Sequence, residues 1–135
     1  MKIRKRILSL AFAVMLIIAM AVPASAAVTR YEGIANYDGC SFSMFAILNT
    51  HTIQNIIELC SIPSDKDYND YLLETCAMFH VYDSEGIIVY GGYRSSNPST
   101  RISSFTWVEV CRYYSSWNTF YVNNEVVGRV NLCVV

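Results

Sequence analysis

The feature that most limits the fold of this chain is the alternation of apolar and polar residues after residue 27. From Cys40 to Leu48 every second residue is apolar, and the odd positions Leu73, Ala77, Phe79 and Val81 continue the pattern. A period of two places one set of side chains on one face of a β-strand. Tyr, Phe, Trp, Val, Ile and Thr, which favour strands, dominate this region. The sequence therefore predicts an all-β fold.

Turn-forming residues separate the predicted strands about every ten residues. Asp38-Gly39 and Asn123-Asn124 tolerate positive φ and predict two-residue hairpin turns. The latter turn would place Trp117, Thr119 and Tyr121 beside Val126, Gly128 and Val130. Asp83-Ser84-Glu85-Gly86 has the Asp and Gly positions of a type I turn.

Other segments define the remaining elements. Residues 52–60 are predicted to form a strand, although the spacing of their apolar residues also fits one face of a helix. Residues 61–70 predict an exposed loop, and Gly91-Gly92 predicts a bulge or bend. The run 101–114 is apolar on both faces, which predicts a central strand covered on both sides.

About seven short strands in residues 27–135 predict one domain with an immunoglobulin-like antiparallel β-sandwich. A small β-barrel is the alternative. The Cys-Trp-Cys spacing of true immunoglobulin domains is missing, since Trp107 lies only four residues before Cys111.

The N-terminus has the organisation of a cleavable signal peptide. Four basic residues lie within residues 1–6, an uncharged apolar run spans 7–22, and Ala24-Ser25-Ala26 provides a cleavage site. We expect residues 1–26 to form a signal helix that is removed, leaving residues 27–135 secreted without a stable membrane anchor. Asn97 is followed by Pro98, so no acceptor for N-glycosylation is present, which favours a bacterial source.

Removal of residues 1–26 leaves six basic residues against eleven acidic ones, a net charge of −5. The six cations are scattered singly, whereas binding to phosphates needs clustered Lys and Arg. The composition therefore argues against nucleic acid as a partner.

Five cysteines, an odd number, follow the signal segment. In an oxidising compartment at least one of them would stay unpaired within a monomer, and the spacing fixes no connectivity. The alternatives are one or two disulfides, five reduced thiols, or a bridge between two molecules. The candidates are Cys40, Cys60, Cys76, Cys111 and Cys133.

The spacing of Asp65, Asp67 and Asn69 matches the first, third and fifth ligand positions of a calcium-binding loop. The glycine expected at the sixth position is Asp70, and the glutamate expected at the twelfth is Cys76. The sequence therefore favours a solvated loop over a calcium site, and it predicts no cofactor.

Glu74, Cys76 and His80 share one strand face, but about 13 Å separates Cys76 from His80 along a strand, too far for direct proton transfer. Nucleophile, zinc-protease and phosphate-loop motifs are missing from the sequence. The sequence predicts no catalytic residues and favours a protein that is not an enzyme.

Tyrosine is the residue type that most suggests binding, because it combines a flat apolar ring with a hydroxyl group. The alternative is that strand tyrosines simply cover the sheets. The candidates are Tyr68, Tyr71, Tyr90, Tyr93, Tyr113 and Tyr114.

The first functional hypothesis is a secreted, non-catalytic module that recognises another protein or a glycan. The second is an antagonistic, bacteriocin-like protein, for which small size and export are the support. The third is a small extracellular hydrolase or a calcium-dependent protein. The sequence leaves the oligomeric state open.

Overall fold

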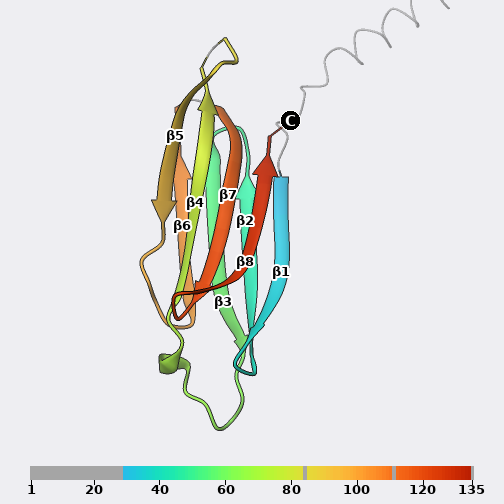
Figure 1. Cartoon of the computed structure of the whole chain (residues 1–135), viewed down its shortest axis with the longest axis vertical. Helices are drawn as coiled ribbons and strands as arrows, with labels where there is room; N and C mark the ends of the chain where they lie inside the picture. The colour runs from blue at the N-terminus through green and yellow to red at the C-terminus, as the bar shows by residue number, and fades with distance from the viewer. Residues whose placement is uncertain (1–28, 84, 111, 135) are drawn as a thin grey trace, which may run out of the picture.

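The computed structural model describes residues 29–134 except 84 and 111, and these form two four-stranded antiparallel sheets packed face to face (Figure 1). The sheet orders are β1-β2-β3-β6 and β5-β4-β7-β8. The strands are β1 (Thr29–Tyr37), β2 (Cys40–Leu48), β3 (Thr52–Ser61), β4 (Leu73–Tyr82), β5 (Ile88–Ser95), β6 (Ile102–Val108), β7 (Arg112–Val122) and β8 (Glu125–Cys133). The all-β prediction and the two-sheet sandwich are confirmed, with one strand more than expected.

The expected signal segment, residues 1–26, lies outside the described residues. Within the described part of the chain, no helix is long and apolar enough to span a membrane.

One core lies between the two sheets, and the predicted alternation places its side chains. Cys40, Phe42, Met44, Ala46 and Leu48 of β2 are all buried, as are Leu73, Ala77, Phe79 and Val81 of β4. Residues 52–61 form a strand, with Ile53 and Ile57 facing the core. The periodicity therefore predicted the inward faces of these three strands.

The predicted turns are also confirmed. Asp38 and Gly39 have φ values of 51° and 78°, and Asn123 and Asn124 have φ values of 50° and 64°. Gly86, with φ of 80°, donates its backbone N–H to the Asp83 carbonyl at 3.2 Å. The loop before β4 includes one short 3₁₀ turn, η1 (Tyr68–Asp70).

The prediction of one central strand over 101–114 is wrong. The run divides into β6, which is the edge strand of one sheet, and β7, which is an inner strand of the other. Glu109 donates its backbone N–H to the His51 carbonyl and Tyr113 donates to the Thr50 carbonyl, both at 2.9 Å. The chain therefore crosses between the sheets over the β2–β3 turn, and Val108 and Val110 are exposed.

The predicted bulge at Gly91-Gly92 is also wrong, because both glycines pair regularly with β4, opposite His80 and Phe79. The register of β4 and β5 shifts instead at Val81 and Tyr82. Glycine is needed at position 92 for packing, since an added Cβ would lie 2.5 Å from Phe79 Cζ.

The β7–β8 hairpin contains a bulge that the sequence analysis missed. The register shifts between Phe120 and Tyr121, so that Thr119 lies opposite Arg129 and Trp117 opposite Asn131. The predicted pairing of Gly128 and Val130 with the Trp117 face is therefore wrong. A glycine within a strand is a common sign of a bulge.

A network of buried polar side chains links the two sheets. Asn55 Nδ2 of β3 donates to Thr75 Oγ1 of β4 at 3.1 Å. The Thr75 backbone N–H donates to Ser96 Oγ at 2.9 Å, and Ser103 Oγ of β6 donates to the same oxygen at 2.7 Å. All four side chains are buried. The network therefore fastens the crossover between β5 and β6 to both layers.

Candidate functional site

A groove with a volume of about 520 Å³ lies on the outer face of the β5-β4-β7-β8 sheet. This volume falls within the range of small-ligand sites in proteins. Its described lining residues come from all four strands of this sheet: Cys76, Met78, Tyr93, Trp117, Asn118, Thr119, Tyr121, Arg129, Val130 and Asn131.

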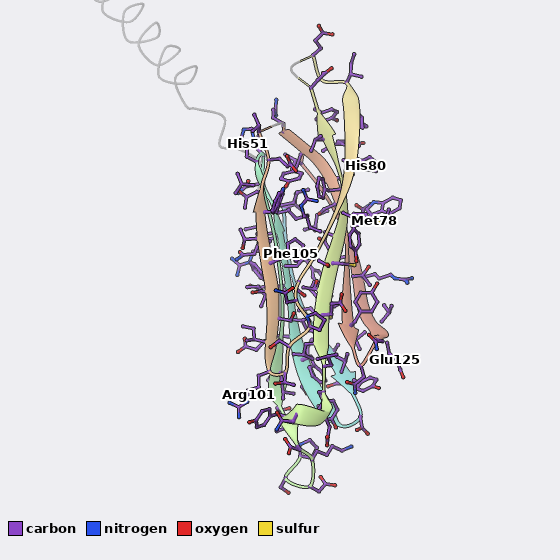
Figure 2. All side chains as sticks on the ribbon, turned by 90° about the vertical axis from the view of Figure 1, so that its left-hand side faces the viewer. His51, Met78, His80, Arg101, Phe105 and Glu125 are labelled. Atoms are coloured by element: carbon purple, nitrogen blue, oxygen red, sulfur yellow. The ribbon has the colours of Figure 1, made fainter. Side chains whose placement is uncertain are left out.

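One row of side chains across the sheet forms the main wall of the groove. Met78 lies opposite both Tyr93 and Trp117, and Trp117 lies opposite Asn131. Tyr93, Met78 and Trp117 each have more than half of their surface exposed. Figure 2 shows Met78 on the outer side of this sheet, pointing away from the core. These large apolar surfaces are therefore open to solvent, although burial would stabilise them.

The next row contains Cys76 of β4, Thr119 of β7 and Arg129 of β8. Cys76 Sγ lies within hydrogen-bond distance of Tyr121 Oη at 3.8 Å, and Cys76 is 5% exposed. A hydrogen bond with Cys76, together with desolvation, raises the pKa of Tyr93 to about 12 and also raises the pKa of Tyr121. The two phenols are therefore neutral at physiological pH.

The bulge in β7–β8 places Arg129 and Asn131 on the outer face, beside Thr119 and Trp117. Arg129 is the only ionised side chain among the described residues that line the groove. It makes no ion pair with any other described residue. Glu74 lies in the following row, opposite Tyr121, and its charge contributes to the raised pKa of that phenol.

Of the six tyrosines predicted from sequence, Tyr93 lines this groove. Tyr71 and Tyr113 are buried in the core, where Tyr113 makes an edge contact with Phe79 at 5.2 Å between ring centres. The Arg101 guanidinium lies 3.6 Å from the ring centre of Tyr68, near η1. Burial gives Tyr71 and Tyr113 a packing role.

Tyr114 lies outside the groove and packs against Tyr82, with ring centres 4.9 Å apart. It lines a smaller neighbouring hollow together with His80 and Cys133. The Tyr90 side chain lies outside the described part of the structure.

Asp65, Asp67 and Asn69 lie in the loop before β4, as predicted. The Asp67 carboxylate accepts the backbone N–H of Asn69 at 2.9 Å and so caps η1. Within the described residues, no group of three or more His, Cys, Asp or Glu side chains is placed to hold a metal ion. The calcium site stays a prediction without a second supporting feature.

The neighbouring Lys66 pairs with Asp38 in the β1–β2 turn, with Nζ 2.6 Å from Oδ2, and Tyr71 Oη donates to the same carboxylate oxygen at 2.8 Å. The Lys66 contact is the main cause of a lowered pKa at Asp38. These contacts hold the loop against the end of the sandwich.

Cys40, Cys60, Cys76 and Cys133 are all free thiols, and Cys111 lies outside the described residues. Cys40 and Cys76 are buried, whereas Cys60 and Cys133 are exposed. Glu74 and Cys76 adjoin or line the groove, but Met78 separates Cys76 from His80 along β4. His51 lies near the β2–β3 turn of the other sheet, far from His80 (Figure 2).

The residue pattern did not predict four of the site residues, Met78, Trp117, Arg129 and Asn131. Trp117 and Met78 had a detectable signal, because each is a large apolar residue on the outer face of a strand whose opposite face is apolar. The sequence carries no such signal for Arg129 and Asn131, because their position on the outer face depends on the bulge.

No protein-family model matches this chain, and no curated protein is significantly similar to it in sequence.

Proposed function

We propose that the protein is a secreted, non-catalytic binding module, and that the groove on the β5-β4-β7-β8 sheet is its binding site. The observation that carries this proposal is the row Tyr93, Met78 and Trp117, in which three large side chains stay exposed around one hollow. Exposed apolar clusters of this kind are typical of binding surfaces.

The fixed orientation of the groove side chains supports binding. Cys76 Sγ lies 3.8 Å from Tyr121 Oη, so a ligand would meet a Tyr121 ring that is already positioned. Binding to an ordered surface avoids part of the entropy cost of fixing side chains.

The surroundings of Cys76 support a non-catalytic role. A nucleophilic thiol needs an adjacent base or a positive charge that favours the thiolate. Cys76 instead contacts the Tyr121 hydroxyl, and Arg129, the cation of the groove, lies two strands away on β8. The described lining residues include no imidazole or carboxylate. The groove therefore offers shape and contacts for binding without a pair of groups that could transfer a proton.

The strand order supports an immunoglobulin-like sandwich. Immunoglobulin domains cross between their sheets three times and pair strand B with E and strand C with F. Here the chain crosses after β3, β5 and β6, and β3 pairs with β6 while β4 pairs with β7. In this interpretation β1 is an additional edge strand beside β2.

Secretion rests on the N-terminal sequence. Mass spectrometry of the protein recovered from the culture medium is expected to find a chain that begins at Ala27. Recovery of the unprocessed chain from the cytosol alone would contradict secretion.

Nuclear magnetic resonance can test the groove directly, because the chain has two tryptophans and therefore two indole N–H signals. Trp117 lies in the groove, whereas Trp107 lies on β6 of the other sheet. We expect ligands from a panel of soluble oligosaccharides and peptides to move the Trp117 signal and leave the Trp107 signal in place.

The variant Trp117→Ala is expected to abolish binding while keeping the fold, since its side chain is exposed. Ile102→Ala, which removes an exposed side chain from the opposite sheet, is the matched control and is expected to bind normally. Equal binding by both variants would reject the groove as the site. Turnover of any panel compound that is lost in Cys76→Ala would reject the non-catalytic role.

A further inference from the structure

The outer wall of the groove presents two aromatic rings on either side of a thioether. Tyr93, Met78 and Trp117 lie on three adjacent strands, so the two rings stand about 10 Å apart. A pyranose ring has one face made of C–H groups and a rim of hydroxyl groups. Such a ring matches an aromatic face that has polar side chains beside it, as Trp117 has in Asn131 and Thr119.

The polar groups of the groove include two that can only donate. The indole Nε1 of Trp117 and the guanidinium of Arg129 are both donors without acceptor capacity. Neither makes a hydrogen bond to another described residue. A ligand that satisfies both must therefore provide acceptors.

Arg129 also determines which acceptor fits best. A guanidinium binds a carboxylate through two parallel hydrogen bonds, and this pairing is stronger than one with a neutral oxygen. Glu74, in the row beyond Thr119 and two strands away from Arg129, would repel a carboxylate placed at its end of the groove. The charges therefore favour one orientation, with the ligand carboxylate at Arg129.

We infer that the groove binds an acidic oligosaccharide, whose sugar rings stack on Trp117 and Tyr93 and whose carboxylate pairs with Arg129. The ligand class is a glycan that carries uronic or sialic acid. This inference rests on the proposed function and adds the chemistry of the ligand. The volume of about 520 Å³ suits a short saccharide, whereas protein partners usually cover a broad patch of about 800 Å² per side.

The test compares charged and neutral forms of one sugar on the intact protein. Trigalacturonic acid and its methyl ester differ only in methylation, and therefore charge, of the carboxyl groups. Sialyllactose and lactose form a second pair, which differs by the sialic acid residue. We expect both acidic sugars, or one of them, to move the Trp117 indole signal, and the sugar that does so identifies the source of the carboxylate. The neutral partner should bind about tenfold to a hundredfold more weakly, because an ionic hydrogen bond is lost.

Two variants separate charge from stacking. By isothermal titration calorimetry, Arg129→Gln should lower the affinity for the acidic sugar to that for its neutral partner, and Trp117→Ala should remove binding of both. Ile102→Ala should bind like the unchanged protein. The unchanged Trp107 signal serves as the measure of folding in Arg129→Gln and Ile102→Ala.

Three results would overturn the inference. Equal affinity for acidic and neutral sugars, unaffected by Arg129→Gln, would reject the acidic ligand and leave the binding groove in place. Binding of a peptide from the panel but of none of the four sugars would reject a glycan and also leave the groove in place. A Trp117 signal that no sugar or peptide moves would reject both the inference and the proposed function.

Discussion

The guanidinium carbon of Arg94 lies 4.0 Å from the ring centre of Trp107. Arg94 belongs to β5 and Trp107 to β6, and these edge strands of different sheets do not pair with each other. Trp107 Nε1 donates to Glu109 Oε1 at 2.9 Å, and the same oxygen lies 3.9 Å from Arg94 Nη2. This cation–π contact therefore joins the two sheets along the edge formed by β5 and β6, where no backbone pairing links them.

A double-mutant cycle with Arg94→Met and Trp107→Leu should measure a coupling of about 1–2 kcal/mol in the free energy of unfolding. The Arg94 side chain is about one-third exposed, and partly desolvated cation–π contacts are stronger than exposed ones. The matched control is Arg30 with Phe45, whose centres are 5.1 Å apart and whose arginine is well exposed. A coupling at Arg94 no larger than that at Arg30 would contradict this assignment.

Gly92→Ala should destabilise the protein by roughly 1–3 kcal/mol, because the new methyl group would overlap the buried Phe79 ring. Gly91→Ala is the control on the same strand, since its added Cβ would lie 3.5 Å from the nearest atom, an ordinary contact. Chemical denaturation of both variants measures the difference. Equal stability of the two variants would show that the Phe79 ring moves aside without cost.

Asn123→Ala should cost roughly 1–3 kcal/mol for two separate reasons. Its φ of 50° strains a residue with a Cβ, and its amide group accepts from the Leu72 N–H at 2.8 Å and donates to the Asp70 carbonyl at 3.0 Å. Asn123→Gly should relieve the strain but would still lose the two hydrogen bonds. Asn124→Gly should be close to neutral, because Asn124 is exposed and its φ of 64° suits glycine. Urea unfolding of the three variants gives the order.

An alkaline titration followed by tyrosinate absorbance should show four late phenols among the tyrosines whose side chains the structure describes. Burial is the main cause of the raised pKa of Tyr113, whereas a hydrogen bond with a cysteine is the first cause at Tyr71, Tyr93 and Tyr121. Each folded pKa lies above the unfolded value of about 10, so this stabilisation is complete below pH 10. It is lost progressively as the pH rises above about 10, so the free energy of unfolding should fall over that range.

Cys76→Ala should lower the pKa of Tyr93 and Tyr121 toward the ordinary tyrosine value, because the thiol contact is the largest cause of both shifts. Tyr113 should keep its raised pKa in this variant, since its main cause is burial. The two groups should therefore separate in the titration curve. An unchanged curve would show that desolvation alone keeps Tyr93 and Tyr121 protonated.

The sequence predicted those features of the fold that depend on neighbouring residues. Alternation placed the inward faces of β2, β3 and β4, and residue types that accept positive φ located the turns at Asp38-Gly39 and Asn123-Asn124. The run 101–114 was predicted wrongly because Val108 and Val110, which have the residue type of a core, lie exposed at an edge strand and in a crossing segment. Sheet membership depends on distant pairing that a local pattern does not contain.

The candidate site was harder to predict because it needs the register of four strands. Tyr93 was recognised from its residue type, but its proximity to Cys76 and Tyr121 follows from pairing across β4, β5 and β7. One bulged position reverses the faces of Arg129 and Asn131, and with them the polar groups of the groove. A register shift by one residue moves every later side chain to the opposite face.

The buried polar side chains between the layers have a consequence for how the chain finds its final alignment. Two packed sheets that shift by one position keep most of their apolar contacts. Apolar packing alone therefore distinguishes poorly between neighbouring alignments of the sheets. Asn55 Nδ2 donates to Thr75 Oγ1 and to the Cys76 carbonyl of the facing sheet, and an alignment that lost both contacts would leave this buried donor without a partner. Asn55 therefore raises the free energy of other alignments of the two sheets and favours the observed one.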